Sequence, residues 1–247
     1  MILLLLAAAT AAQAGPADSR TDRFDRCASL AERDPGAART EAGRWQASGG
    51  GHYARACAGL AFATQKNWAG AAAEFEAAAR AAQVARNERS ASYWAQAGNA
   101  WLAAGDATKA RTALDSALTT GTLSGLALGE AQLDHARALV AGGDLEAARA
   151  DIDLALTTAS DDPLAWLLSA TLARRAGDPR RAKTDIGEAL KRSSDDAAVQ
   201  LEAGNIAALA GDEAAARSAW AQAARLAPMS DAGKSAVVAL KQFDAKP

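Results

Sequence analysis

The apolar positions of the chain repeat with the period of an α-helix. In five segments a small, a large and a small apolar residue stand at positions i, i+4 and i+7, a spacing that places all three on one helix face. We expect the small residues to let a neighbouring helix approach closely and the large residue to fill the space between two units. The five sets are Ala71, Phe75 and Ala78; Ala110, Leu114 and Ala117; Ala148, Ile152 and Ala155; Ala182, Ile186 and Ala189; and Ala216, Trp220 and Ala223.

Turn signals separate these segments from a second series of helical segments. Gly-Asp pairs stand at residues 105-106, 143-144, 177-178 and 211-212, and the last three pairs are 34 residues apart. Gly adopts the left-handed conformation that ends many helices, and Asp caps the start of the next helix. The pattern therefore predicts a helix–turn–helix unit that recurs about every 34 residues.

Composition favours an all-α protein. The chain of 247 residues holds 72 Ala but only 4 Ile and 5 Val, which leaves few β-branched side chains for the core of a sheet. Lys and Arg total 27 against 29 Asp and Glu, for a net charge of -2. This balance disfavours a nucleic-acid-binding protein, which would need a basic surface.

The order of these landmarks resembles the tetratricopeptide-repeat (TPR) family. The motif Trp94-x-x-Ala97-Gly98-x-x-Trp101 is similar to the first helix of that repeat, and Pro228 ends the fifth unit where the family often has Pro. The resemblance implies an all-α, right-handed α-solenoid of antiparallel helix pairs. We place five repeats at residues 52-85, 91-124, 129-162, 163-196 and 197-230.

The units depart from the family pattern in three places. Lys66-Asn67 stands where the other units have Gly-Asp, and Ala136 and Ala170 replace the first-helix Gly of the third and fourth units. The departures affect single positions and leave the repeat of the array intact.

Two further segments flank the repeats. Residues 15-51 lack the small, large, small apolar spacing of the repeats and are predicted to form a degenerate or capping helix pair. Residues 231-247 are predicted to form a capping helix with a tail. A stacked array needs such caps because its terminal units expose an apolar face. Val237, Leu240 and Phe243 are expected to cover that face at the C-terminal end.

The first 14 residues have the pattern of an export signal. An apolar run, Ile2 to Ala9, is followed by Ala12-Gln13-Ala14, which fits an A-x-A cleavage site and predicts cleavage after Ala14. We therefore expect a periplasmic or secreted protein whose mature chain has no integral membrane segment. The run is preceded by no Lys or Arg, and an uncleaved apolar tail is the alternative.

Export would give the two cysteines a role. In an oxidising compartment Cys27 and Cys57, on neighbouring predicted helices, are candidates for a disulfide. Such a bridge would stabilise the fold by about 3 kcal/mol. The alternative is a pair of separate buried thiols.

Side chains that could perform catalysis or hold a metal do not cluster in the sequence. His52 and His135 are interpreted as surface or groove residues, because neither has a second His or a Cys nearby. Gly233-Lys234-Ser235 resembles the end of a phosphate-binding loop but lacks the preceding Gly and a strand. We expect no catalytic residue, no cofactor and no metal.

The TPR resemblance implies that the first helices line a concave groove, which would hold a protein or peptide partner. Positions beside the core stripe of these helices are the candidate binding residues. They are Tyr53, Gln96, Asn99, Asp134, Arg137, Leu167, Thr171, Arg174, Glu202 and Asn205.

The leading hypothesis is a non-catalytic scaffold that binds a protein or peptide in the bacterial periplasm. If the N-terminus is not cleaved, a cytosolic TPR adaptor or co-chaperone is the alternative. An enzyme, or an enzyme subunit, of cell-wall metabolism is the alternative from a different class, although no acid–base pair recommends it.

Overall fold

The computed structural model describes residues 19–244, which form helices joined by short turns with no strand among them. The predicted signal segment 1-14, the start of the segment 15-51 and the last three residues of the tail lie outside this range. The predicted all-α fold of repeated helix pairs is confirmed.

The described chain contains thirteen helices. An N-terminal pair is followed by five repeated pairs and a last single helix. The helices are α1 (Arg20–Arg33), α2 (Pro35–Ala47), α3 (Gly51–Thr64), α4 (Trp68–Val84), α5 (Arg89–Ala103), α6 (Ala107–Thr119), α7 (Gly125–Ala141), α8 (Leu145–Thr158), α9 (Pro163–Arg175), α10 (Pro179–Arg192), α11 (Ala197–Leu209), α12 (Glu213–Leu226) and α13 (Asp231–Asp244).

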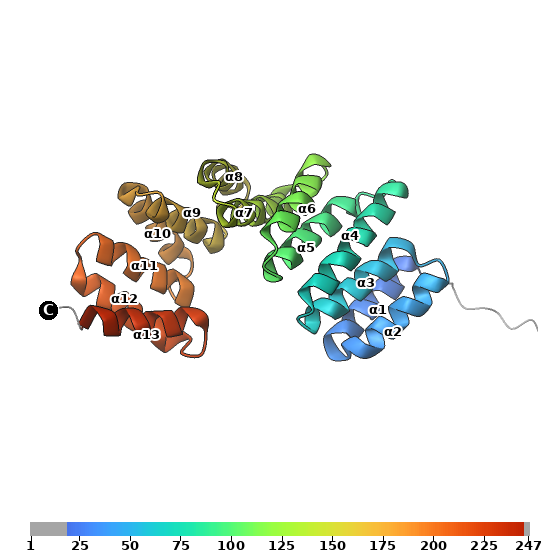
Figure 1. Cartoon of the computed structure of the whole chain (residues 1–247), viewed down its shortest axis with the longest axis horizontal. Helices are drawn as coiled ribbons and strands as arrows, with labels where there is room; N and C mark the ends of the chain where they lie inside the picture. The colour runs from blue at the N-terminus through green and yellow to red at the C-terminus, as the bar shows by residue number, and fades with distance from the viewer. Residues whose placement is uncertain (1–18, 245–247) are drawn as a thin grey trace, which may run out of the picture.

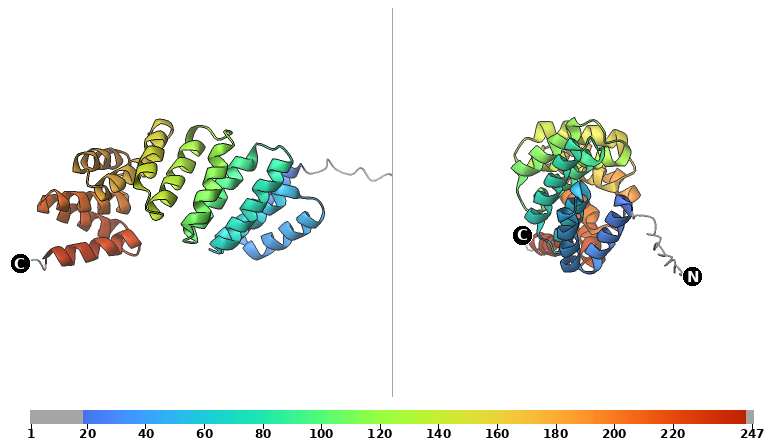
Figure 2. Two further views of the ribbon diagram at one scale, coloured as in Figure 1. Left: turned by 45° about the horizontal axis from the view of Figure 1, so that its top comes forward. Right: turned by 90° about the vertical axis from the view of Figure 1, so that its right-hand side faces the viewer.

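The helix pairs stack side by side into an arch. In Figure 1, α7 and α8 lie at its crown, while the N-terminal pair and α13 lie at its two feet. Figure 2 shows the same stack from two other directions. Apart from marginal contacts, each helix touches only the next helix and the next but one. Such a quasi-one-dimensional arrangement is typical of a solenoid.

The turn inside each repeat is built as the Gly-Asp pairs predict. Gly105, Gly143, Gly177 and Gly211 adopt φ values from 76° to 86°, which only Gly adopts without strain. The Asp that follows each of them accepts a hydrogen bond from the backbone N–H three residues on, at 3.0–3.1 Å. In the first unit Asn67 provides the same cap, while Lys66 takes the left-handed conformation with φ 57°.

A large side chain of each second helix packs against a small residue of the first helix. A Cβ added to Gly59, Gly98 or Gly204 would overlap the side chain of Phe75, Leu114 or Trp220 respectively. In the third and fourth units the large residue is the β-branched Ile152 or Ile186. There Ala136 and Ala170 occupy the place of Gly in the same apolar clusters. Both departures from the repeat pattern thus coincide with an Ile at the facing position of the second helix.

A disulfide fastens the N-terminal pair to the first repeat. The sulfur of Cys27 in α1 is bonded to that of Cys57 in α3, and the two Cα atoms are 5.9 Å apart. Both cysteines are buried beside Ala42 of α2. The bond therefore joins α1 to α3 at a point of the core where α2 also packs.

The last helix covers the C-terminal end of the array. Ala236, Leu240 and Phe243 pack against the cluster around Trp220, whose ring centroid lies 5.4 Å from that of Phe243. Val237 does not belong to this face as expected, and it is 37% exposed. Because successive helix residues differ by about 100° in direction, Ala236 points inward and Val237 away from the core.

We predict opposite effects for two Gly→Ala substitutions in helices. Gly98→Ala should lower the free energy of unfolding by about 1–3 kcal/mol, because the added Cβ overlaps Leu114. Gly187→Ala in α10 should raise it by about 0.5–1 kcal/mol, because nothing lies within 4 Å of the added Cβ and Ala is the better helix former. Urea unfolding followed by circular dichroism measures both. Equal effects of the two substitutions would contradict the packing described here.

Candidate functional site

The ten candidate groove residues all lie on first helices, namely α3, α5, α7, α9 and α11. Contacts join α5 to α7 and α9 to α11, whereas successive second helices touch at most marginally. In a curved stack the helices that approach each other more closely lie on the inner side. The first helices therefore form the inner face of the arch.

Three of the candidate residues form a polar bridge between α5 and α7. Asn99 donates its side-chain amide to Asp134 at 2.8 Å, and Arg137 donates to the other carboxylate oxygen of Asp134 at 2.8 Å. Both Asn99 and Arg137 are exposed. Asp134 is thus neutralised within the chain, and its main effect is to tie two neighbouring repeats together.

Three further candidates form a second bridge, between α9 and α11. The Nε of Arg174 lies 2.5 Å from Oε1 of Glu202, whose side chain is buried. Asn205 donates to Oε2 of Glu202 at 3.2 Å and accepts a hydrogen bond from the indole of Trp220 at 3.1 Å. Removal of Arg174 would leave a buried carboxylate without its cation, so this bridge supports the repeat interface.

An open cleft separates the two bridged pairs of helices. No hydrogen bond or ion pair joins α7 to α9 in the described part of the chain, and the two helices touch at most marginally. The cleft has a volume of about 490 Å³. Its wall on the α7 side holds Ala136, Arg137, Val140 and Ala141; its wall on the α9 side holds Leu168, Thr171, Leu172 and Arg175; Ile152 of α8 forms the floor. We call this site the α7–α9 cleft.

The α7–α9 cleft combines apolar walls with two cations. Two of the ten candidate residues, Arg137 and Thr171, line it, whereas Val140, Leu168 and Arg175 were not among the candidates. Leu168, Thr171 and Arg175 follow each other at helical spacing, which is a signal that sequence analysis could have used. The separation of α7 from α9 has no such signal, because it depends on which repeats are bridged.

The remaining candidates do not belong to this cleft. Tyr53 packs in an aromatic cluster, with its ring stacked on Trp45 at 6.3 Å and 4.2 Å from the ring of His52. Leu167 packs against the apolar cluster of the fourth repeat. Gln96 is exposed on α5. The structure thus divides the candidate residues between core, bridges and cleft.

Comparison with solved structures shows which fold this arrangement represents. PilW, a widely conserved type IV pilus biogenesis factor, is similar with a TM-score of 0.70 and 18% identity, over 87% of this chain and 98% of that chain. PilF of Pseudomonas aeruginosa is similar with a TM-score of 0.68 and 16% identity, over 89% and 99% of the two chains. YrrB, a TPR protein with an unusual peptide-binding site, is similar with a TM-score of 0.54 and 15% identity, over 75% and 91%.

The chain has the TPR fold. At identities of 15–18% in these three solved structures, the likeness defines the architecture and not the partner. No protein-family model matches the sequence, and no curated protein matches it. The resemblance to the TPR family in sequence is therefore confirmed at the level of the fold.

The outer face of the TPR array is also bridged by polar groups. A carboxylate stands at one register position of three second helices, as Glu76 in α4, Asp115 in α6 and Asp153 in α8. Glu76 accepts a hydrogen bond from the indole of Trp101 at 2.7 Å, and Asp153 pairs with Arg149 at 2.9 Å and with Arg181 of α10. The contact of Glu76 joins α4 to the first helix α5, and that of Asp153 joins the successive second helices α8 and α10.

The fourth second helix has Gly187 at the same register. The corresponding furrow, between α10 and α12, is an apolar hollow of about 620 Å³ lined by small residues such as Ala203, Ala215 and Ala219. One repeat earlier, the positions equivalent to these three alanines hold Ser169, Arg181 and Asp185, which are joined by hydrogen bonds. The loss of these groups therefore opens the last furrow.

Both histidines are buried, which corrects their interpretation as surface or groove residues. His52 packs between aromatic rings, and its ring Nδ1 lies 3.3 Å from the hydroxyl of Tyr93. Burial and the nearby charges of Arg89 and Arg20 lower the pKa of His52 below its usual 6.5. Burial raises the pKa of Tyr93 to about 12. Sequence analysis missed the burial of His52 because Tyr93, whose hydroxyl lies beside its ring, comes from another helix.

His135 of α7 is held between two second helices. Its Nδ1 lies 2.5 Å from Asp151 of α8, and its Nε2 lies 3.1 Å from Asp115 of α6 without a well-directed hydrogen bond. The hydrogen bond to Asp151 outweighs burial and raises the pKa of His135 above its usual 6.5, and the charges of Asp151 and Asp115 act in the same direction against that of Arg111. The ring of His135 therefore lies against one acid of α6 and one acid of α8, and links these two helices through α7.

No group of three or more His, Cys, Asp or Glu residues suited to a metal ion occurs between residues 19 and 244. In the same part of the chain, no helix combines the length and the apolar character needed to span a bilayer.

We predict that the two histidines affect stability with opposite dependence on pH. The pKa of His135 is raised in the folded state, so its stabilising effect is full below pH 6.5 and is lost as the pH rises through the raised pKa. The free energy of unfolding that His135→Gln removes should therefore be larger at about pH 5.5 than at about pH 8.5. For His52→Gln the difference should change in the opposite direction, because folding lowers the pKa of His52. Urea unfolding of the three proteins at both pH values measures this. A loss for His135→Gln that does not vary with pH would contradict the proposed ion pairs.

Proposed function

We propose that this chain is a non-catalytic scaffold that binds a peptide segment of a partner protein in the α7–α9 cleft. The observation that carries the proposal is the interruption of the inner face. Polar bridges engage Asn99 of α5 and both candidate residues of α11, whereas the surface between α7 and α9 stays open. YrrB, a TPR protein of similar architecture, is described as having a peptide-binding site, which supports a peptide as the ligand class.

The lining of the cleft indicates what such a peptide would present. Val140 and Leu168, both partly exposed, offer apolar surface that favours an apolar side chain of the ligand. Arg175, at the end of α9, is exposed and forms no ion pair with a described residue, and a guanidinium pairs well with a carboxylate. A segment with a bulky apolar residue next to an acidic residue or a chain terminus fits both features.

The scaffold is also proposed to act in the bacterial periplasm. The signal-like segment 1-14 motivates this location, and the bond between Cys27 and Cys57 supports it, because disulfides persist in oxidising compartments. In this proposal the periplasmic chain holds its partner without any bond-making chemistry.

A photo-crosslinking amino acid at residue 171 tests the binding site. Thr171 lies in the α7–α9 cleft, whereas Thr184 is exposed on the second helix of the same repeat and lies outside it. We expect illumination of cells to give a discrete adduct with one partner from position 171 and none from position 184. Mass spectrometry of the adduct identifies the partner.

A second substitution gives this experiment its control. Arg175→Glu should strongly reduce the adduct formed from position 171, because it places a negative charge where the ligand carboxylate would lie. Arg180→Glu, an exposed change of the same charge on α10, should leave the adduct unchanged. Equal adducts from positions 171 and 184, or none from 171, would refute the proposed site.

The N-terminal sequence of the purified protein tests the location. Export predicts a mature chain that begins at Gly15 and is recovered from the periplasmic fraction. A chain that is recovered only from the cytosol with Met1 or Ile2 at its N-terminus would refute export, while leaving the peptide-binding proposal to its own test.

A further inference from the structure

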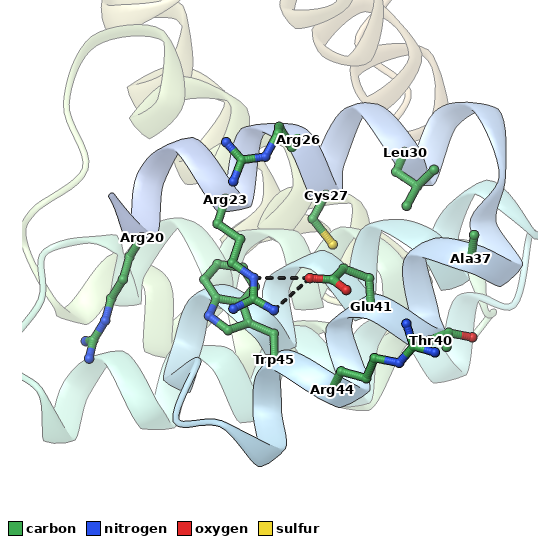
Figure 3. A pocket seen from close by; sticks show the side chains of 10 residues that line it. All are labelled: Arg20, Arg23, Arg26, Cys27, Leu30, Ala37, Thr40, Glu41, Arg44 and Trp45. Atoms are coloured by element: carbon green, nitrogen blue, oxygen red, sulfur yellow. Dashed lines mark hydrogen bonds and ion pairs between the residues drawn. The ribbon is translucent and has the colours of Figure 1, made fainter. Parts of the chain in front are cut away.

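A second hollow of the molecule lies far from the α7–α9 cleft, at the N-terminal foot of the arch. It runs between α1 and α2, has a volume of about 830 Å³, and is shown in Figure 3. Its charged lining consists of four arginines, Arg20, Arg23, Arg26 and Arg44, and one acid, Glu41. The lining of this hollow is therefore positively charged, although the whole chain has a net charge of -2. We call it the α1–α2 cleft.

One of the four arginines is already neutralised and fixed. Both Nε and a terminal nitrogen of Arg23 donate to the same oxygen of Glu41, at 3.1 and 2.7 Å. The guanidinium also lies 4.9 Å from the ring centroid of Trp45, within the range of a cation–π contact. The pair formed by Arg23 and Glu41 therefore divides the cleft in its middle, and the acid compensates only this one cation.

Two other arginines have no internal counter-charge. Neither Arg20 nor Arg44 forms an ion pair with any residue of the described chain, and both are exposed. In Figure 3 they lie on opposite sides of the pair formed by Arg23 and Glu41 and do not converge on one point. Separated guanidinium groups suit carboxylates spaced along a chain better than one compact dianion, which needs convergent donors.

The walls of the cleft are held rigidly. Cys27, which lines it, is bonded to Cys57 of α3, and the buried Trp45 is stacked on Tyr53 of α3. A ligand would therefore bind without first ordering the two helices, which lowers the entropic cost of binding. Leu30 and Ala37 add apolar surface that can contact the methylene groups of acidic side chains.

The charge of the cleft exceeds what an end cap requires. A cap needs a polar outer face, and α13 meets this need at the other end of the array with mixed charges, Asp231, Lys234 and Lys241. We infer that the α1–α2 cleft is a second binding site, which takes an acidic peptide segment with several Asp or Glu residues. Its occupation does not require the α7–α9 cleft, and the two sites could hold two segments of one partner.

Binding of a fluorescently labelled hexaglutamate peptide to the full, disulfide-bonded protein tests this site. We expect saturable binding by fluorescence anisotropy at about 20 mM salt, weakened at about 150 mM salt by screening. The double variant Arg20→Gln/Arg44→Gln should lose about tenfold or more in affinity. Because both side chains are exposed, the variant should keep the melting temperature of the parent protein.

A charge-matched variant serves as the control. Arg33→Gln/Arg39→Gln removes the same charge from the same two helices outside the cleft lining, and it should change the affinity by less than about threefold. Thr171→Glu, in the other cleft, should leave hexaglutamate binding unchanged, so that failure of one proposed site is distinguishable from failure of the other. Equal losses in the two arginine double variants would show diffuse attraction and overturn the site.

Two further measurements distinguish an acidic peptide from other anionic ligands. Inorganic phosphate that displaces hexaglutamate at equal or lower concentration would overturn the assignment to a peptide, in favour of a compact anion. Absence of hexaglutamate binding, together with sedimentation on phosphatidylglycerol vesicles that depends on Arg20 and Arg44, would overturn it in favour of a membrane surface.

Discussion

The array depends on one contact, in which a large side chain of a second helix is seated against a small residue of its first helix. Phe75, Leu114 and Trp220 each face a glycine, and Ile152 and Ile186 each accompany an alanine. This contact closes each of the five hairpins, and the stacking of the closed hairpins on one another produces the arch.

Much of this architecture could be predicted because its causes are local. The spacing of Ala110, Leu114 and Ala117 and the turn at Gly105-Asp106 lie within a few residues of each other, so the pattern is readable along the chain. The positions of the histidines could not be predicted in the same way. The acids that surround His135 come from the helices before and after its own, at Asp115 and Asp151, and neither has a fixed spacing from it.

The same limit applies to the binding surface. The repeat register places all ten candidate residues on first helices, but it does not reveal which side chains reach a neighbouring repeat. Asp134 and Glu202 are equivalent in register, and each binds a donor from the preceding first helix, Asn99 or Arg174. Which part of the inner face stays open between these bridges depends on how the repeats assemble. The arginines of the α1–α2 cleft escape sequence analysis as well, because Arg23 and Glu41 meet across 18 residues.

The glycine at residue 187 gives the array a mechanical asymmetry. Between α6 and α10 polar contacts resist separation of neighbouring second helices, because Asp115 of α6 and Asp151 of α8 both lie against His135 of α7, and Asp153 of α8 pairs with Arg181 of α10. The furrow between α10 and α12 is instead an open, mainly apolar hollow, with polar side chains such as Lys183, Gln200 and Gln222 in its lining. The joint between the fourth and fifth repeats is therefore the most compliant part of the outer rim, and the C-terminal foot of the arch is the end that flexes most easily when the curvature changes.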